Sequence, residues 1–125
     1  MRKNNQAGFT LIELVMVIVI LGALAAIALP KFVDFGSDAK AAAVQGVAGA
    51  LSSASAINYA QRKLNSANGS AVTNCTSVGP LLQAGALPSG YTITSAAIAA
   101  DATNAGCVVT GPGPASAAFT ATGIL

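Results

Sequence analysis

The sequence predicts an α+β protein in which one long N-terminal α-helix packs on a small antiparallel β-sheet domain that holds one disulfide. An unbroken apolar run near the N-terminus, an alanine-rich amphipathic stretch after it, and short β-prone segments between turn residues carry this prediction. We therefore divide the chain into four parts: a leader over 1–8, a hydrophobic helix over 9–30, an amphipathic helix over 31–64 and a β-rich domain over 65–125.

The composition argues against an enzyme. Hydrophobic residues make up 54% of the chain and charged residues 8%, whereas a soluble domain carries about 25% charged residues. There is no histidine, and none of the acids lies near a candidate nucleophile and base. No catalytic, cofactor-binding or metal-binding residues are therefore predicted. The four acidic residues are Glu13, Asp34, Asp38 and Asp101.

The distribution of charge argues against nucleic-acid binding. The formal net charge of +2 comes from Arg2 and Lys3, since the remaining basic residues balance the four acids. A nucleic-acid binder needs a clustered basic surface, and this sequence does not show one.

The apolar run extends from Phe9 to Leu29, and Glu13 is its only charged residue. As a helix it would span ~31 Å, about the thickness of the hydrocarbon core of a bilayer. Arg2 and Lys3 should stay on the cytoplasmic side, which leaves the rest of the chain outside.

A weak point is expected between Gly22 and Pro30. Proline cannot donate a main-chain hydrogen bond, so the carbonyl of Ala26 loses its usual partner, and Gly22 lowers helix propensity two turns earlier. The two open interpretations are a kink in a membrane helix and a local loss of helical order when the environment changes.

The stretch over 31–64 is predicted to continue the helix and to bury one face. Alanine is frequent there, and Arg62 and Lys63 suit a helix C-terminus, where the helix dipole favours cations. The predicted buried positions, spaced by three and four residues, are Val44, Val47, Ala48, Leu51 and Ala54.

The C-terminal domain is predicted to begin with a loop over 65–73 and a short helix over 80–86. Three β-prone runs follow, which we expect to form a small antiparallel sheet against the helix: Tyr91–Thr94, Cys107–Thr110 and Ala118–Thr122. In an exported region the pair Cys75 and Cys107 predicts a disulfide, worth ~3–4 kcal/mol in the chain-entropy model.

The most specific motif is Gly8-Phe9-Thr10-Leu11-Ile12-Glu13-Leu14, preceded by a short basic leader. It closely resembles the class III signal of type IV pilins. The resemblance covers about the first 60 residues, and the segments over 31–38 and 44–59 most resemble mannose-sensitive haemagglutinin-type pilins, of type IVa. It implies that a prepilin peptidase cuts after Gly8 and methylates the new N-terminal residue, Phe9.

The same resemblance implies a structural subunit rather than a catalyst. The precursor would sit in the bacterial inner membrane, meet the pilus assembly machinery there, and polymerise with copies of itself into an extracellular helical filament used in adhesion, biofilm formation or motility. It also raises the alternative, beside a simple kink, that the Gly22–Pro30 segment loses helical order in the fibre.

Glu13 is the residue expected to carry assembly, because a carboxylate within a spanning segment is costly and therefore a functional candidate. It would pair with the Phe9 amine of a neighbouring subunit, a role that the family resemblance also implies. The open alternative is local: Thr10 and Glu13 have the spacing of a capping box, in which Glu13 caps its own helix.

Two other functions compete with the pilus subunit. A type II secretion pseudopilin shares the N-terminal signal, but its major members hold calcium in C-terminal loops, and here Asp101 is the only acid after residue 38. An ordinary secretory signal cleaved after Ala28 would instead release a soluble binding module.

Overall fold

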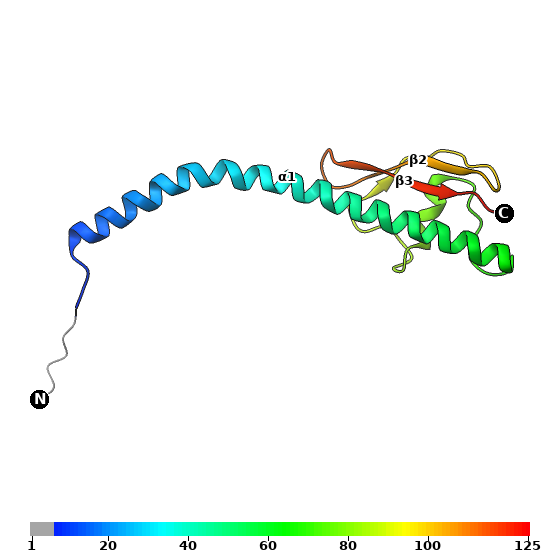
Figure 1. The fold of residues 1–125 in the computed structure, drawn as a ribbon, viewed down its shortest axis with the longest axis horizontal. Coiled ribbons are helices and arrows are strands. Elements are labelled where there is room, and N and C mark those ends of the chain that lie inside the picture. The colour runs from blue at the N-terminus through cyan, green and yellow to red at the C-terminus, as the bar shows by residue number, and fades with distance from the viewer. Residues whose placement is uncertain (1–6) are drawn as a thin grey trace, which may run out of the picture. The chain divides into compact units, whose positions relative to one another are not determined.

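The computed structural model describes residues 7–125, so Arg2 and Lys3 lie outside the described part of the chain. It falls into two compact units, divided between Gly36 and Ser37, and each unit is described by itself. The elements, labelled in Figure 1, are α1 (Leu11–Leu64), the 3₁₀ helix η1 (Cys75–Leu81), β1 (Thr92–Ile93), β2 (Thr103–Thr110) and β3 (Ser116–Thr122).

The N-terminal unit consists of the first part of α1 and the residues just before it. By its length and composition this part of α1 could cross a membrane, and its most apolar stretch is not buried within the chain. Gly22 and Pro30 both lie inside the helix. Whether they lose helical order in a fibre stays a prediction, because the structure describes a single subunit.

In the C-terminal unit, one face of α1 packs against the sheet (Figure 1). The predicted stripe is confirmed at Val44, Ala48 and Leu51, which are buried, while Val47 is half-buried beside them. The stripe continues with two polar residues, Ser55 and Asn58, which are also buried. The opposing side of the core consists of Val72, Cys75, Val78, Ile98, Cys107, Val109, Phe119, Ala121 and Ile124.

The sheet is antiparallel in the order β1-β2-β3. The three predicted strands are confirmed, but β2 begins at Thr103 rather than Cys107. Asn104, Ala105 and Gly106 are residue types depleted in strands, yet Asn104 pairs with Ala121 and Thr103 with Thr122, beyond a register shift between Asn104 and Cys107. The partner strand, and not intrinsic propensity, therefore extends β2.

The short helix predicted over 80–86 is misplaced. The structure has η1 over Cys75–Leu81, with Pro80 near its end, and Leu82 has an extended backbone. The helix starts early because the side chain of Asn74 accepts a hydrogen bond from the backbone N–H of Thr76 and caps its first turn. A tight turn then follows, in which the Gly85 N–H donates to the carbonyl of Leu82.

Candidate functional site

The predicted processing junction lies just before α1, where the backbone is not helical. Gly8 is exposed, and the side chain of Phe9 is 88% exposed. A Cβ atom added at Gly8 would meet nothing within 4 Å. The fold of the subunit therefore gives no steric reason for a glycine at position 8. A reason for this residue type must be sought in a partner that binds the segment.

Thr10 and Glu13 form the capping box that their spacing allows. The Thr10 backbone N–H donates to Glu13 Oε2 at 2.8 Å, and the Glu13 backbone N–H donates to Thr10 Oγ1 at 3.3 Å. The two residues thereby satisfy two main-chain donors at the start of α1. Within residues 7–125, Glu13 Oε1 has no hydrogen-bond partner, and a carboxylate oxygen can accept further bonds. Local capping by Glu13 is confirmed, and it occupies only the Oε2 atom of the carboxylate.

The large apolar residues of the N-terminal unit lie on the surface of this chain. The exposed fraction of each residue is between 40% and 88%. An exposed apolar surface that surrounds a helix requires cover from lipid or from other helices. These residues are Phe9, Leu11, Ile12, Leu14, Val15, Met16, Val17, Ile18, Val19, Ile20, Leu21, Leu24, Ile27, Leu29, Phe32, Val33 and Phe35.

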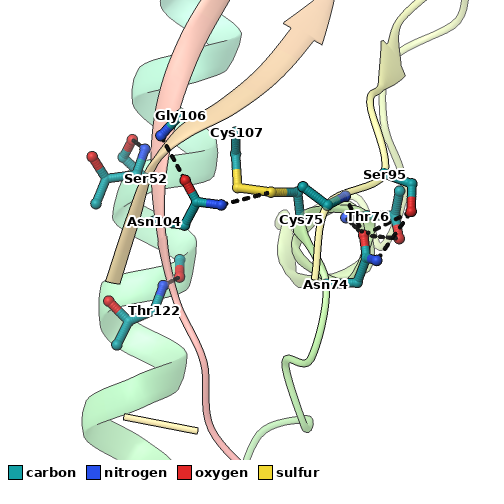
Figure 2. The surroundings of a disulfide bond; sticks show 12 residues. Ser52, Asn74, Cys75, Thr76, Ser95, Asn104, Gly106, Cys107 and Thr122 are labelled. Atoms are coloured by element: carbon teal, nitrogen blue, oxygen red, sulfur yellow. Dashed lines mark hydrogen bonds between the residues drawn. A yellow bond between two sulfur atoms is a disulfide. The ribbon is translucent and has the colours of Figure 1, made fainter. Parts of the chain in front are cut away.

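The Cys75–Cys107 disulfide is present and joins η1 to β2 (Figure 2). Both cysteines are buried, and their Cα atoms are 5.6 Å apart. Beside it, the Asn74 amide oxygen accepts hydrogen bonds from the Thr76 N–H at 3.1 Å and the Ala96 N–H at 3.2 Å. The disulfide and Asn74 thus fix η1 both to the sheet and to the segment that follows β1.

Two serines of α1 bond the outer edge of β3, a contact that sequence reasoning missed. Ser52 Oγ accepts from the Thr120 N–H, and Ser55 Oγ accepts from the Thr122 N–H, each at 3.0 Å. These two main-chain donors on the edge of β3 are therefore bonded inside the subunit rather than offered to another strand. The available signal was Ser55 itself, which continues the buried spacing of Val44, Ala48 and Leu51.

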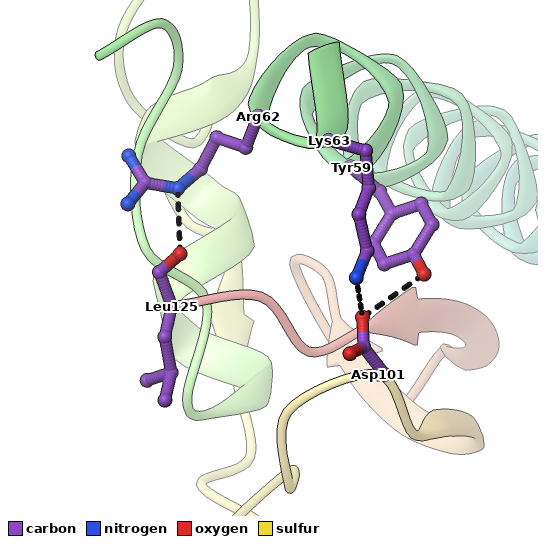
Figure 3. Close-up of polar contacts among 5 residues, drawn as sticks. All are labelled: Tyr59, Arg62, Lys63, Asp101 and Leu125. Carbon is purple, nitrogen blue, oxygen red and sulfur yellow. Dashed lines mark hydrogen bonds and ion pairs between the residues drawn. The ribbon is translucent and has the colours of Figure 1, made fainter. Parts of the chain in front are cut away.

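The last turns of α1 are tied to two distant segments (Figure 3). Asp101 Oδ1 lies 2.6 Å from Lys63 Nζ and accepts a hydrogen bond from the Tyr59 hydroxyl at 3.0 Å. Arg62 Nε donates to the carbonyl of Leu125 at 3.3 Å. Because Asp101 accepts these bonds, its pKa is lowered, and bonding to Asp101 raises the pKa of Lys63.

The sequence alone does not predict the contacts of Asp101 with Lys63 and Tyr59. The backbone of Asp101 adopts the left-handed conformation, with φ at 59°, which Asp tolerates better than most residues. No sequence pattern connects Lys63 to Asp101, because the tertiary fold alone brings them together.

Neither a metal centre nor a deep ligand cavity is evident in the described part of the chain. Among residues 7–125, no three His, Cys, Asp or Glu side chains cluster. An open, mainly apolar groove of about 450 Å³ lies between one side of α1, including Ala54 and Ile57, and the segment of Leu81 and Leu82. This groove suits contact with apolar surface better than capture of a polar small molecule.

Comparison with known proteins places the N-terminal segment in a defined group. Residues 3–29 match the family model of the prokaryotic N-terminal methylation motif. The chain is 55% identical over 56 residues to the type IV narrow pilus major component PilA5 of Thermus thermophilus, which covers 45% of this chain and 48% of that protein. No solved structure matches significantly.

Two further relatives extend the comparison. Fimbrial protein EcpC of Eikenella corrodens is 40% identical over 77 residues, which covers 58% of this chain and 50% of that protein. The type II secretion system core protein G of Pseudomonas aeruginosa is 41% identical over 54 residues, covering 43% and 38%. The chain thus spans half the length or less of these relatives. Residues 3–29 thus carry the prokaryotic N-terminal methylation motif, and the chain is similar in sequence to pilus and fimbrial proteins and to a type II secretion core protein.

Proposed function

We propose that this chain is the precursor of a structural subunit, not an enzyme, that polymerises into an extracellular type IV pilus filament. The precursor is held in the bacterial inner membrane by its apolar helix and passes to the pilus assembly machinery. The finished fibre serves adhesion, biofilm formation or motility. The resemblance over 31–38 and 44–59 favours a type IVa subunit of the mannose-sensitive haemagglutinin type.

The exposed apolar surface of α1 is the observation that carries this proposal. Every large apolar side chain from Phe9 to Phe35 is exposed, and the described chain offers no surface that covers them. Lipid covers such a helix before assembly, and helices of neighbouring subunits cover it afterwards. The exchange of lipid contact for helix contact lets the same surface serve both states.

The Gly8–Phe9 junction supports processing by a prepilin peptidase that also methylates. Both residues are exposed in a non-helical segment, so a protease can reach the bond between them. The fold needs no glycine at position 8. A requirement of the peptidase for a small residue there would account for Gly8, and cleavage would leave a positive amine on Phe9.

The Glu13 carboxylate is proposed to pair with the Phe9 amine of a neighbouring subunit. Its Oε2 atom caps its own helix, while Oε1 is available for the second interaction. In an apolar filament core such a pair fixes the axial offset between subunits, because any other offset leaves a charge without a partner.

A type II secretion pseudopilin is the second candidate, favoured by the similarity to core protein G. That similarity covers 54 residues, less than half of this chain. A soluble module cleaved after Ala28 is the weaker alternative. In it the helix up to Ala28 would be discarded, although the methylation motif model matches almost all of it.

The test of the assembly role is the variant Glu13→Gln. Glutamine suits the same position of a capping box, so this change keeps the cap and removes only the charge. We expect membrane insertion to persist and the yield of sheared extracellular fibres to fall to background. Asp38→Asn is the matched control, since it removes a carboxylate of α1 outside the apolar run, and it should leave fibre yield unchanged.

A complementary variant separates capping from charge. Thr10→Val removes the hydroxyl that caps Glu13 N–H but keeps the carboxylate, and we expect it to reduce fibre yield only slightly. Normal fibres from Glu13→Gln together with few fibres from Thr10→Val would assign Glu13 to capping alone and refute the pairing.

A further inference from the structure

The loop after α1 contains an asparagine followed by a glycine, Asn68-Gly69, and both residues are exposed. The only hydrogen bond of Asn68 within residues 7–125 is that of its main-chain N–H to the carbonyl of Asn65, at 2.9 Å. Its side-chain amide has no partner there. The side chains of the other asparagines in this range, Asn58, Asn65, Asn74 and Asn104, all make hydrogen bonds.

An unbonded asparagine before glycine has the two features that favour attack of the following main-chain nitrogen on its side-chain carbonyl. Glycine has no Cβ to shield its nitrogen or to restrict the backbone rotation that brings this nitrogen to the Asn68 Cγ atom. Gly69 adopts φ of +71°, and its N–H makes no hydrogen bond within the described chain. Asn65 differs on both counts, because Ser66 follows it and its Oδ1 accepts from the Ala67 N–H at 2.9 Å.

We propose that Asn68 is a site of spontaneous deamidation in the folded subunit. The Gly69 nitrogen forms a bond to Asn68 Cγ, the side-chain nitrogen leaves as ammonia, and a five-membered succinimide remains. Water then opens the ring at either carbonyl, which gives aspartate or isoaspartate. The reaction consumes one water, releases one ammonia and involves no oxidant, reductant or enzyme.

The modification changes the charge of the loop. Downstream of Gly8 the side chains carry four basic and four acidic residues, so a new carboxylate makes a neutral set of side chains negative. It also places an anion one residue before the Gly69 carbonyl, to which Arg62 Nη1 donates at 3.5 Å. A fibre would therefore gain negative charge on this loop as it ages.

The isoaspartate product should also disturb the backbone at Ser70, which Asn58 holds in place. Asn58 fixes Ser70 through two hydrogen bonds of 2.8 Å, one from its Nδ2 to the Ser70 carbonyl and one from the Ser70 N–H to its Oδ1. Isoaspartate adds one carbon to the main chain just before Gly69. We expect this insertion to loosen the Ser70 contacts, so that the aged form is cleaved faster in this loop by an added protease.

The test incubates the purified full-length protein in warm, mildly alkaline buffer and maps its peptides by mass spectrometry over time. Isoaspartate is detected with isoaspartyl methyltransferase. We expect conversion at Asn68 to exceed conversion at Asn65, which lies on the same tryptic peptide, by at least severalfold, and to approach the rate of a synthetic peptide spanning 65–73. Absence of conversion in the protein while that peptide converts, or equal conversion at Asn65 and Asn68, would overturn the proposal.

Asn68→Gln is the matched variant. It keeps the amide but forms the larger ring reluctantly, so its loop should stay unmodified and keep its protease resistance on ageing. Gly69 is unsuitable for substitution, because a Cβ there would collide with the Asn58 side chain. Loss of protease resistance in aged Asn68→Gln equal to that of the parent would contradict the proposed link between modification and loosening.

Discussion

The two units of this chain differ in where their interactions are satisfied. In the C-terminal unit, buried apolar residues meet one another, β3 is bonded by serines of α1, and a disulfide links η1 to β2. In the N-terminal unit Thr10 and Glu13 cap the start of α1, and the large apolar side chains around the helix are exposed. The C-terminal part of α1 thus contributes to a hydrophobic core, whereas its N-terminal part exposes apolar side chains that no described residue of its own unit covers.

This contrast shows what each unit requires of its sequence. The C-terminal unit needs specific partners within the chain, so substitutions there should act on folding. In our proposal the N-terminal unit needs an apolar surface and the Glu13 carboxylate, so substitutions there should act on membrane insertion and assembly. Stability and fibre formation should therefore be separable by site.

The largest effect on stability is expected from Leu51→Ala. Leu51 is fully buried against the sheet, and truncating such a residue costs about 2–5 kcal/mol. Chemical denaturation of the full chain in detergent, followed by a signal from the C-terminal unit, measures the loss. The matched variant is Leu21→Ala, at a side chain 59% exposed, which should leave this transition unchanged but lower fibre yield. Equal destabilisation by both variants would remove the distinction between the units.

A smaller loss is expected from Ser55→Ala. This change leaves the Thr122 N–H without its acceptor at the edge of β3, which costs about 1–3 kcal/mol when the group is buried. Ser53→Ala, on the exposed side of the same helix, is the control and should have little effect. The same denaturation experiment compares them, and identical midpoints would show that the helix serines do not stabilise the sheet edge.

The smallest effect is expected at the exposed joint of Lys63 and Asp101. The lowered pKa of Asp101 gives stability that is present above its unfolded value, ~3.9, and is lost as pH falls through the folded value. The raised pKa of Lys63 gives stability that is present below its unfolded value, ~10.4, and is lost as pH rises through the folded value. The Lys63–Asp101 ion pair should therefore stabilise the fold at pH values between these two unfolded pKa values.

Asp101→Asn tests this joint, because asparagine tolerates the same backbone conformation and can still accept from the Tyr59 hydroxyl. We expect a slightly lower thermal midpoint near neutral pH, and no difference from the parent in strong acid or in high salt, where exposed pairs are screened. A difference that persists unchanged in high salt would point to a cause other than charge.

The sequence predicted those parts of the molecule that depend on regular patterns. The long helix, the buried stripe of Val44, Ala48 and Leu51, the three strands and the Cys75–Cys107 disulfide are all confirmed. The Thr10–Glu13 capping box follows a fixed local spacing and is also present.

The missed features depend on contacts between distant residues. The start of η1 is set by the Asn74 cap, and the beginning of β2 by its pairing with β3. The serine contacts to β3 and the Lys63–Asp101 pair join residues far apart in sequence, for which no local pattern exists. The roles of Gly8, Phe9 and Glu13 in processing and assembly stay predictions, because they involve partners outside the single chain.

The most direct test of the central claim is the intact mass and N-terminal peptide of the chain recovered from sheared extracellular fibres. We expect a chain that begins at Phe9 and carries one methyl group on its amine, so that the exposed apolar helix is retained in the fibre. A chain that begins at Leu29 and is found soluble in the medium would contradict it, because the helix proposed to build the filament would then have been removed.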